Sequence, residues 1–245
     1  MTIFSPPRSR SNSNQMNNIF SITFCLYMLT LTAEAGEIRG TVKAEGKPVP
    51  ESGGGGQYDS RKYKFVEKVN YEELRNFVVY IEGPLTNATT ATNALARVNT
   101  RRVNQEKANF TPAVLPIVVG TTVDWPNNDD IYHNVFSMSD AKEFDLGLYK
   151  GNPKEKQITF DKVGRVEVFC SIHANMHCTI LVLENPYFAV ADEAGRFAIT
   201  NVPPGNYKLK AWHERLPSQV QEITVPADGE VKINFTLGIK NLPKY

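Results

Sequence analysis

The segment Arg165–Cys170 (RVEVFC) constrains the fold more than any other part of the chain. Apolar and polar residues alternate along it, which predicts a strand with the Cys170 sulfur on its apolar face. A second apolar run, TILVL, begins at Thr179, only a few residues later. The pattern therefore predicts two strands joined by a short loop, and this loop carries His173 and Met176 after the cysteine at a Cys-x2-His-x2-Met spacing.

The rest of the chain from Gly36 onward also has the composition of strands. Short alternating or apolar stretches recur at regular spacing, and Gly, Pro and Asn separate them. Residues 77–81 (FVVYI) predict a buried strand, 98–110 contain a strand candidate, and the turn Pro203-Pro204-Gly205 joins two alternating stretches. Only YEELR, at 71–75, suggests a helical turn. We therefore predict an all-β fold built from sandwiches.

The loop residues and an upstream histidine together predict a metal site. His133 lies in NDDIYHNVFS, so the candidate donors are two imidazoles, one thiolate and one thioether. This set, from His133, Cys170, His173 and Met176, is the ligand set of a type 1 (blue) copper site with a weak axial bond to methionine. One alternative stays open, because Cys170 and Cys178 could instead form a disulfide in an exported protein.

The N-terminus predicts export. Arg8 and Arg10 precede an apolar run from Ile19 to Ala33, and Ala33-Glu34-Ala35 forms an A-x-A cleavage pattern. We therefore expect residues 1–35 to be a signal peptide, the protein to reach the periplasm, and no stable membrane span to remain after cleavage. An uncleaved N-terminal anchor is the alternative.

Charge and histidine content exclude several classes of function. Lys plus Arg total 27 against 26 for Asp plus Glu, which gives no indication of a nucleic-acid partner. A copper oxidase or nitrite reductase would need further histidine clusters, and the chain has only four histidines. We expect a protein without substrate turnover.

Residues 97–185 resemble a cupredoxin. The features that carry the resemblance are VLPIVVGTTVDW, N-x-D, HNVF, G-x-V-x-V-F-C-x2-H-x2-M and a closing ILVL strand, and the short Met spacing is similar to that of amicyanin. The resemblance implies a Greek-key sandwich, with one copper ion bound by His133, Cys170, His173 and Met176. It also implies that Asn134 braces the ligand loop through hydrogen bonds.

One position departs from this family pattern. Cupredoxins usually have a small residue shortly after the axial methionine, whereas this chain has His177 and Cys178. His177 could be an exposed loop residue, a fifth donor or a competing ligand, and Cys178 would be an idle thiol if Cys170 binds copper. His213 beside Trp212 is interpreted as a structural histidine.

The flanking segments resemble a carboxypeptidase regulatory-like, prealbumin-type sandwich. The cues are G-x-I-x-G-x-V at 36–42 and D-x2-G-x-F-x-I-x-x-V-P-P-G-x-Y-x-L at 192–209. We expect residues 36–96 and 186–245 to form one discontinuous sandwich into which the cupredoxin is inserted, with TNATTATNAL at 86–95 as a linker. The layout resembles bacterial exported proteins described as plastocyanin-like or methylamine-utilisation-like.

Three classes of function compete at this point. The leading one is an exported one-electron carrier with an unidentified redox partner. By resemblance, His173 would be the electron exit, with Ile172 and Ala174 around it. The second is a copper-binding or storage protein. The third is a structural or carbohydrate-binding sandwich with an accessory copper site, whose candidate aromatic residues are Tyr187, Phe188, Tyr207 and Trp212.

Overall fold

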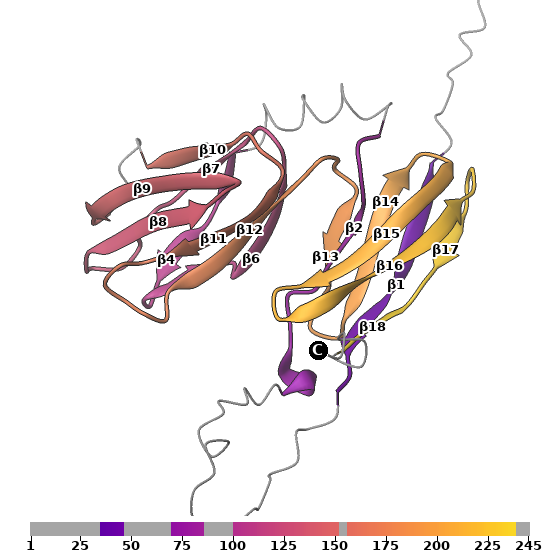
Figure 1. Cartoon of the computed structure of the whole chain (residues 1–245), viewed down its shortest axis with the longest axis horizontal. Coiled ribbons are helices and arrows are strands. Elements are labelled where there is room, and N and C mark those ends of the chain that lie inside the picture. The colour runs from indigo at the N-terminus through magenta and orange to yellow at the C-terminus, as the bar shows by residue number, and fades with distance from the viewer. Residues whose placement is uncertain (1–34, 47–69, 86–99, 152–155, 239–245) are drawn as a thin grey trace, which may run out of the picture. The chain divides into compact units, whose positions relative to one another are not determined.

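The computed structural model of the chain describes residues 35–46, 70–85, 100–151 and 156–238. The predicted signal peptide, apart from its last residue, and the predicted linker at 86–95 lie outside these ranges. No helix within them is long and apolar enough to cross a membrane. Apart from one 3-10 turn, η2 (Tyr71–Glu73), the described elements are strands, which confirms the all-β fold class (Figure 1).

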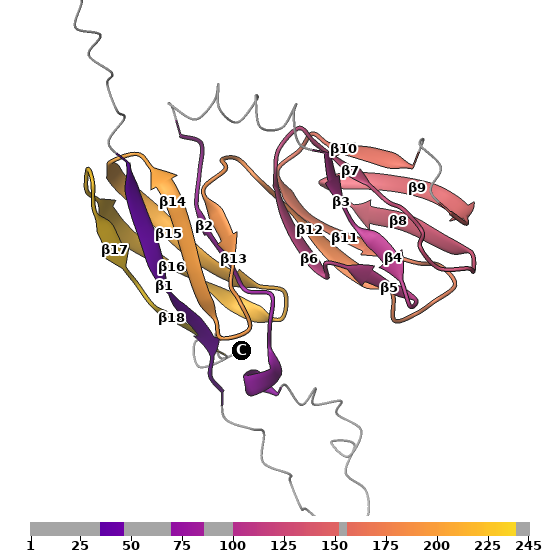
Figure 2. The same ribbon diagram turned by 180° about the vertical axis from the view of Figure 1, so that it is seen from behind.

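One sandwich lies between residues 100 and 183. Its larger sheet has the strand order β6-β12-β11-β8-β9 and its smaller sheet the order β10-β7-β3 (Figures 1 and 2). The strands of the larger sheet are β6 (Val114–Val118), β8 (His133–Ser139), β9 (Lys142–Tyr149), β11 (Gly164–Phe169) and β12 (His177–Leu183). Those of the smaller sheet are β3 (Thr100–Arg102), β7 (Thr121–Asp124) and β10 (Gln157–Phe160).

A separate hairpin accompanies this sandwich and is seen best from behind (Figure 2). It consists of β4 (Asn104–Glu106) and β5 (Asn109–Thr111), joined by the two-residue loop Lys107-Ala108. The strand candidate expected at 98–110 is therefore divided into three short strands. The chain reverses here because Lys107 and Ala108 both adopt left-handed backbone conformations, with φ of 54° and 51°.

The apolar residues that alternate along Arg165–Cys170 form the inner face of β11 and of the residue that follows it. Val166, Val168 and Cys170 are buried there, whereas Arg165 is exposed. Strand β11 pairs antiparallel with β12, with Phe169 opposite His177. Since the two strands are joined by residues 170–176, the pairing brings the predicted ligand loop to one end of the sheet.

The second sandwich combines strands from both ends of the described chain. One sheet has the order β14-β1-β17, with β18 also pairing with β1, and the other has the order β13-β2-β15-β16. The first sheet contains β1 (Gly36–Ala44), β14 (Arg196–Val202), β17 (Glu230–Lys232) and β18 (Phe235–Leu237). The second contains β2 (Val78–Ile81), β13 (Phe188–Val190), β15 (Gly205–His213) and β16 (Leu216–Val225).

This pairing places residues far apart in sequence in one core. Ile38 and Val42 of β1 pack with Phe197, Leu209 and residues of the C-terminal strands in a single apolar cluster. The predicted boundary between residues 96 and 97 lies outside the described residues and stays a prediction.

The D-x2-G pattern of this sandwich has a local physical cause. The Asp192 carboxylate accepts hydrogen bonds from the backbone N–H groups of Ala194 and Arg196, at 3.0 and 2.8 Å. Gly195 has φ 76°, and a side chain at this position would collide with the carbonyl oxygen of Val42, because its Cβ would lie only 2.2 Å away. Aspartate and glycine at these positions therefore form the tight turn that starts β14.

Candidate metal centre

Three of the four predicted donors meet at one end of the larger sheet. One ligand atom each from His133, Cys170 and His173 lie within 4.8 Å of one another. The two Nδ1 atoms of His133 and His173 are 3.0 Å apart, and the Cys170 sulfur is 3.6 Å from Nδ1 of His173. Among the His, Cys, Asp and Glu side chains of the described ranges, these three have donor atoms close enough together to hold one metal ion.

His133 reaches the site because it is the first residue of β8. Its side chain is fully buried, and its Nε2 lies 2.8 Å from a carboxylate oxygen of Asp129. A carboxylate accepts hydrogen bonds, so Nε2 is the ring atom that donates to Asp129, and Nδ1 faces His173, where it can bind a metal ion.

The loop brings the fourth predicted donor next to the cysteine. The N–H of Met176 donates to the carbonyl of His173 at 3.0 Å, and the N–H of Cys170 donates to the carbonyl of Met176 at 3.3 Å. The Met176 side chain is 1% exposed and packs in the same apolar cluster as Cys170. His173, in contrast, is partly exposed. The loop thus points two of its donors inward and keeps one imidazole at the surface.

These donors fit a soft transition-metal ion. Metal bonds of about 2.0 Å to nitrogen and about 2.3 Å to sulfur easily reach donors that are 3.0–3.6 Å apart. The set contains no carboxylate ligand, which disfavours magnesium or calcium, and thiolate with imidazole suits copper or zinc. A buried cysteine with two imidazoles and a nearby buried methionine is the combination associated with type 1 copper.

Asn134 connects the first ligand strand to the ligand loop. Its backbone N–H lies 3.4 Å from the Cys170 sulfur, and its side-chain oxygen accepts from the N–H of Ser171 at 3.3 Å. Its amide nitrogen donates to the Asp145 carboxylate at 2.7 Å, which orients the side chain. Asn134 and the contact to the sulfur are buried, whereas the side-chain partners Asp145 and Ser171 are exposed.

His177 does not join the donor group. It pairs with Glu167 across the β11–β12 ladder, and the Glu167 carboxylate also accepts from the Thr179 hydroxyl at 3.1 Å. The His177 ring packs on Phe169, with ring centroids 4.9 Å apart. Because side chains alternate along β12, His177 lies on the opposite side of the strand from the buried Cys178. His177 is therefore neither a fifth donor nor a competing ligand in this structure, and instead of an exposed loop residue it is the partly exposed first residue of β12, paired with Glu167.

Both described cysteines are free thiols, so the structure contains no Cys170–Cys178 disulfide. Cys178 lies opposite Val168 on the neighbouring strand and is completely buried. Burial raises the pKa of the Cys178 thiol far above its ordinary value. The neutral thiol therefore acts as a small apolar side chain in the core.

A buried polar network supports the sheet beside His133. Tyr149 lies opposite His133 in the β8–β9 pair, and its hydroxyl donates to the carbonyl of Trp125 at 2.6 Å. The amide nitrogen of Gln105 donates to the Tyr149 hydroxyl and to the same carbonyl. Burial raises the pKa of Tyr149 well above its ordinary value, so this phenol stays protonated.

Sequence reasoning missed three residues near the site. Asp129 contacts His133, Asp145 orients Asn134, and Asn127 holds the preceding loop by donating to the carbonyls of Ile131 and Tyr149. The sequence signals were the N-x-D pattern and the acidic pair before the histidine, and neither showed which carboxylate contacts His133.

His213 and four aromatic residues of the second sandwich have structural roles. His213 is buried, accepts from the N–H of Arg215 at 3.1 Å and packs on Phe77 with centroids 4.9 Å apart. It is thus a structural histidine. The four aromatic residues considered for carbohydrate binding pack wholly or partly against apolar clusters, and they are Tyr187, Phe188, Tyr207 and Trp212.

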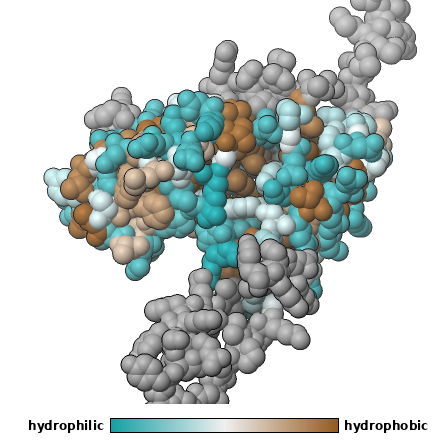
Figure 3. Space-filling view, viewed as in Figure 1, coloured by the Kyte–Doolittle hydropathy of each residue, from teal (hydrophilic) through white to brown (hydrophobic). Residues whose placement is uncertain are grey.

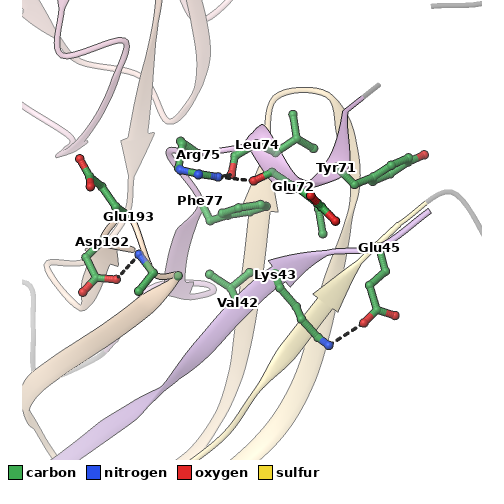
Figure 4. Close-up of a pocket in the computed structure, with 13 residues that line it drawn as sticks. Val42, Lys43, Glu45, Tyr71, Glu72, Leu74, Arg75, Phe77, Asp192 and Glu193 are labelled. Carbon is green, nitrogen blue, oxygen red and sulfur yellow. Dashed lines mark hydrogen bonds and ion pairs between the residues drawn. The ribbon is translucent and has the colours of Figure 1, made fainter. Parts of the chain in front are cut away.

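A pocket of about 410 Å³ lies in the second sandwich, near the ends of β1 and η2 (Figure 4). Arg75 donates to the carbonyls of Glu72 and Leu74, and Lys43 pairs with Glu45. The Asp192 carboxylate at its edge holds the turn before β14. These polar groups serve the fold of the sandwich.

Comparison with known families agrees with the two resemblances. Residues 97–183 match the family described as copper binding proteins, plastocyanin/azurin family, and residues 178–238 match the carboxypeptidase regulatory-like domain. No curated protein sequence matches the chain.

Solved structures similar to the chain include several copper proteins. Amicyanin from Paracoccus versutus is 24% identical, with 44% of this chain and 99% of that chain covered and a TM-score of 0.31. A purple cupredoxin from Nitrosopumilus maritimus is 23% identical, with 34% of this chain and 98% of that chain covered and a TM-score of 0.29. The Cu-containing nitrite reductase from Thermus scotoductus SA-01 is 28% identical, covering 36% of this chain but only 23% of that chain, with a TM-score of 0.33.

The predicted cofactor, copper, is confirmed by the family match together with the His–Cys–His group. The chain combines a copper-binding segment of the plastocyanin/azurin type with a carboxypeptidase regulatory-like segment.

Proposed function

We propose that this protein is an exported one-electron carrier that holds one type 1 copper ion through His133, Cys170, His173 and Met176. The observation that carries the proposal is the convergence of two imidazole nitrogens and one buried thiol within 4.8 Å, beside a buried methionine. The copper ion, when bound, supplies the reversible Cu(I)/Cu(II) couple.

The surrounding residues suit rapid electron transfer. Cu(I) and Cu(II) prefer different geometries, so electron transfer is fast when the protein prevents the ligands from rearranging. Here His133 begins strand β8, Cys170 directly follows strand β11, and Asn134 holds the loop by donating its N–H to the Cys170 sulfur and accepting from the N–H of Ser171. Burial of Cys170 and Met176 excludes water from the soft ligands, which supports the Cu(I) state.

His173 is the proposed electron exit because it is the partly exposed ligand. Exposed apolar side chains flank the ligand segments: Ile172 follows Cys170 in the loop, and Tyr132 precedes His133. Figure 3 shows apolar patches interspersed with polar ones on this sandwich. A redox partner of unknown identity would dock weakly on such a surface, since electron-transfer encounters bury little area.

The proposal is tested by titrating the purified chain, residues 36–245, with Cu(II) and recording visible absorption and electron paramagnetic resonance spectra. We expect an intense thiolate-to-copper absorption and a narrow copper hyperfine splitting, both lost in Cys170→Ser. Cys178→Ser serves as the matched control because it also removes a buried thiol but lies outside the donor group.

The outcome separates the carrier from a storage protein. A carrier shows a reversible potential and rapid electron self-exchange between molecules. Copper binding without reversible redox behaviour would favour storage, and no copper binding at all would overturn the proposal. Export is tested separately by locating the protein in cell fractions and determining its mature N-terminus.

A further inference from the structure

The Asp129 carboxylate lies where three N–H groups converge. One oxygen accepts from the N–H of Lys107 at 2.6 Å, and the other accepts from the N–H of Ala108 at 2.9 Å and from Nε2 of His133 at 2.8 Å. All three neighbours donate to the carboxylate, so Asp129 acts here as an acceptor only.

These contacts connect the metal ligand to the β4–β5 hairpin. Asp129 lies in the loop before β8 and His133 is the first residue of β8, whereas Lys107 and Ala108 form the hairpin turn. Both turn residues have positive φ, which is unfavourable for residues other than glycine, and such a turn usually contains Asn-Gly. Because both turn amides are held by the same carboxylate, Asp129 is itself held in one orientation towards His133.

We propose that Asp129 is a positioning residue for the copper ligand His133: it holds the imidazole in one tautomer and orientation and lowers the reduction potential of the site. This inference rests on the proposed function. Carboxylate partners of metal-bound histidines fix the ring and increase its basicity. A more basic imidazole and a nearby negative charge both stabilise Cu(II) relative to Cu(I), so the potential falls.

The chain contains a matched control at the next position. Asp130 carries the same charge, but its side chain is 98% exposed and it pairs with Lys150 at 2.5 Å. Asp130→Asn therefore removes one negative charge close to the site without removing a contact to His133. A comparison of the two variants separates the hydrogen bond from the general effect of charge.

The test compares wild type, Asp129→Asn and Asp130→Asn in the copper-loaded chain by voltammetry and by competition for Cu(II). We expect Asp129→Asn to lower Cu(II) affinity by about 10–100-fold. If Cu(I) affinity is unchanged, each tenfold loss raises the potential by about 59 mV for one electron. Asp130→Asn should change both quantities much less.

A variant with a stabilised hairpin turn separates the positioning role of Asp129 from its effect on folding. The double change Lys107→Asn and Ala108→Gly supplies the residues that this turn prefers, so the hairpin depends less on Asp129. In this background Asp129→Asn should leave the unfolding temperature of the apo-protein nearly unchanged and still raise the potential. A fall in stability with an unchanged potential would show that Asp129 only supports the turn, and would overturn the inference.

The outcome for wild type distinguishes the two proposals. If wild type gives no type 1 spectrum, the proposed function fails. If wild type gives that spectrum and the two aspartate variants have the same potential, only the role of Asp129 fails.

Discussion

The backbone N–H of Asn134 lies 3.4 Å from the Cys170 sulfur, while the side-chain oxygen of the same asparagine accepts from the N–H of Ser171 at 3.3 Å. One residue of β8 thus contacts both the sulfur and the start of the ligand loop. The N–H that contacts the sulfur belongs to the backbone and survives any substitution of the side chain except proline, so the effects of the backbone contact and of the side-chain contacts can be measured separately.

Asn134→Ala removes the side-chain hydrogen bonds to Ser171 and Asp145 and keeps the N–H to the sulfur. We expect the free energy of unfolding to fall by about 1–2 kcal/mol, because each lost bond contributes about 1 kcal/mol. The looser loop should also release copper faster. Urea unfolding and copper release to a chelator measure the two effects. Asn206→Ala, which removes a surface bond to Thr224, should not change copper release.

Cys178→Ser places a hydroxyl in the apolar core beside Val168. We expect a destabilisation of about 1–3 kcal/mol, because the buried hydroxyl lacks an assured partner. The absorption spectrum of the copper-loaded protein should stay that of wild type, since the thiol is outside the donor group. Loss of the spectrum with retained folding would show that Cys178 contributes to the site.

His177→Gln keeps a polar side chain next to Glu167 but removes the imidazole. We expect a change in stability of about 1 kcal/mol or less, because the pair is partly exposed. The copper hyperfine splitting should be unchanged. An altered splitting would contradict the placement of His177 outside the site and restore its interpretation as a fifth donor.

Ala108→Gly should stabilise the chain by about 1 kcal/mol, because glycine adopts the left-handed conformation of this position without steric conflict. Thermal unfolding of the apo-protein measures the effect. Ala189→Gly, in the regular strand β13, should instead destabilise by about 0.5–1 kcal/mol. Equal effects of the two substitutions would argue against the strained turn.

The second sandwich should lose stability in acid because of His213. Burial is the largest effect on the pKa of His213 and lowers it. Glu214 and the backbone of Arg75 raise this pKa, the charges of Arg215 and Arg165 lower it, and the net result is a lowered pKa. The folded state therefore binds the proton less readily than the unfolded state. The stabilisation that neutral His213 gives the folded state is fully present above the ordinary histidine pKa, about 6.5, and is lost as the pH falls below that value. Protonation also removes the acceptor for the N–H of Arg215.

Calorimetry between pH 8 and pH 5 measures this loss. His213→Gln retains an acceptor and does not titrate, so its unfolding temperature should depend less on pH. An identical pH dependence in wild type and variant would exclude His213 as the cause.

Much of this protein could be predicted from local sequence. Alternation in Arg165–Cys170 predicts a strand whose inner face includes the cysteine, because successive side chains of a strand point to opposite faces. The types and order of His133, Cys170, His173 and Met176 indicate copper, because thiolate, thioether and imidazole ligands select such a metal. The all-β class follows equally from local patterns of strands and turns.

Only the tertiary structure decided which side chains surround the donors. Asp129 and Asp130 are adjacent and chemically identical in sequence, yet one contacts His133 and the other pairs with Lys150 at the surface. The difference arises from the hairpin turn at Lys107 and Ala108, which lies about twenty residues away and supplies two amides to one carboxylate. Hydrogen bonds between distant segments depend on the packing of strands, and no local pattern contains that information.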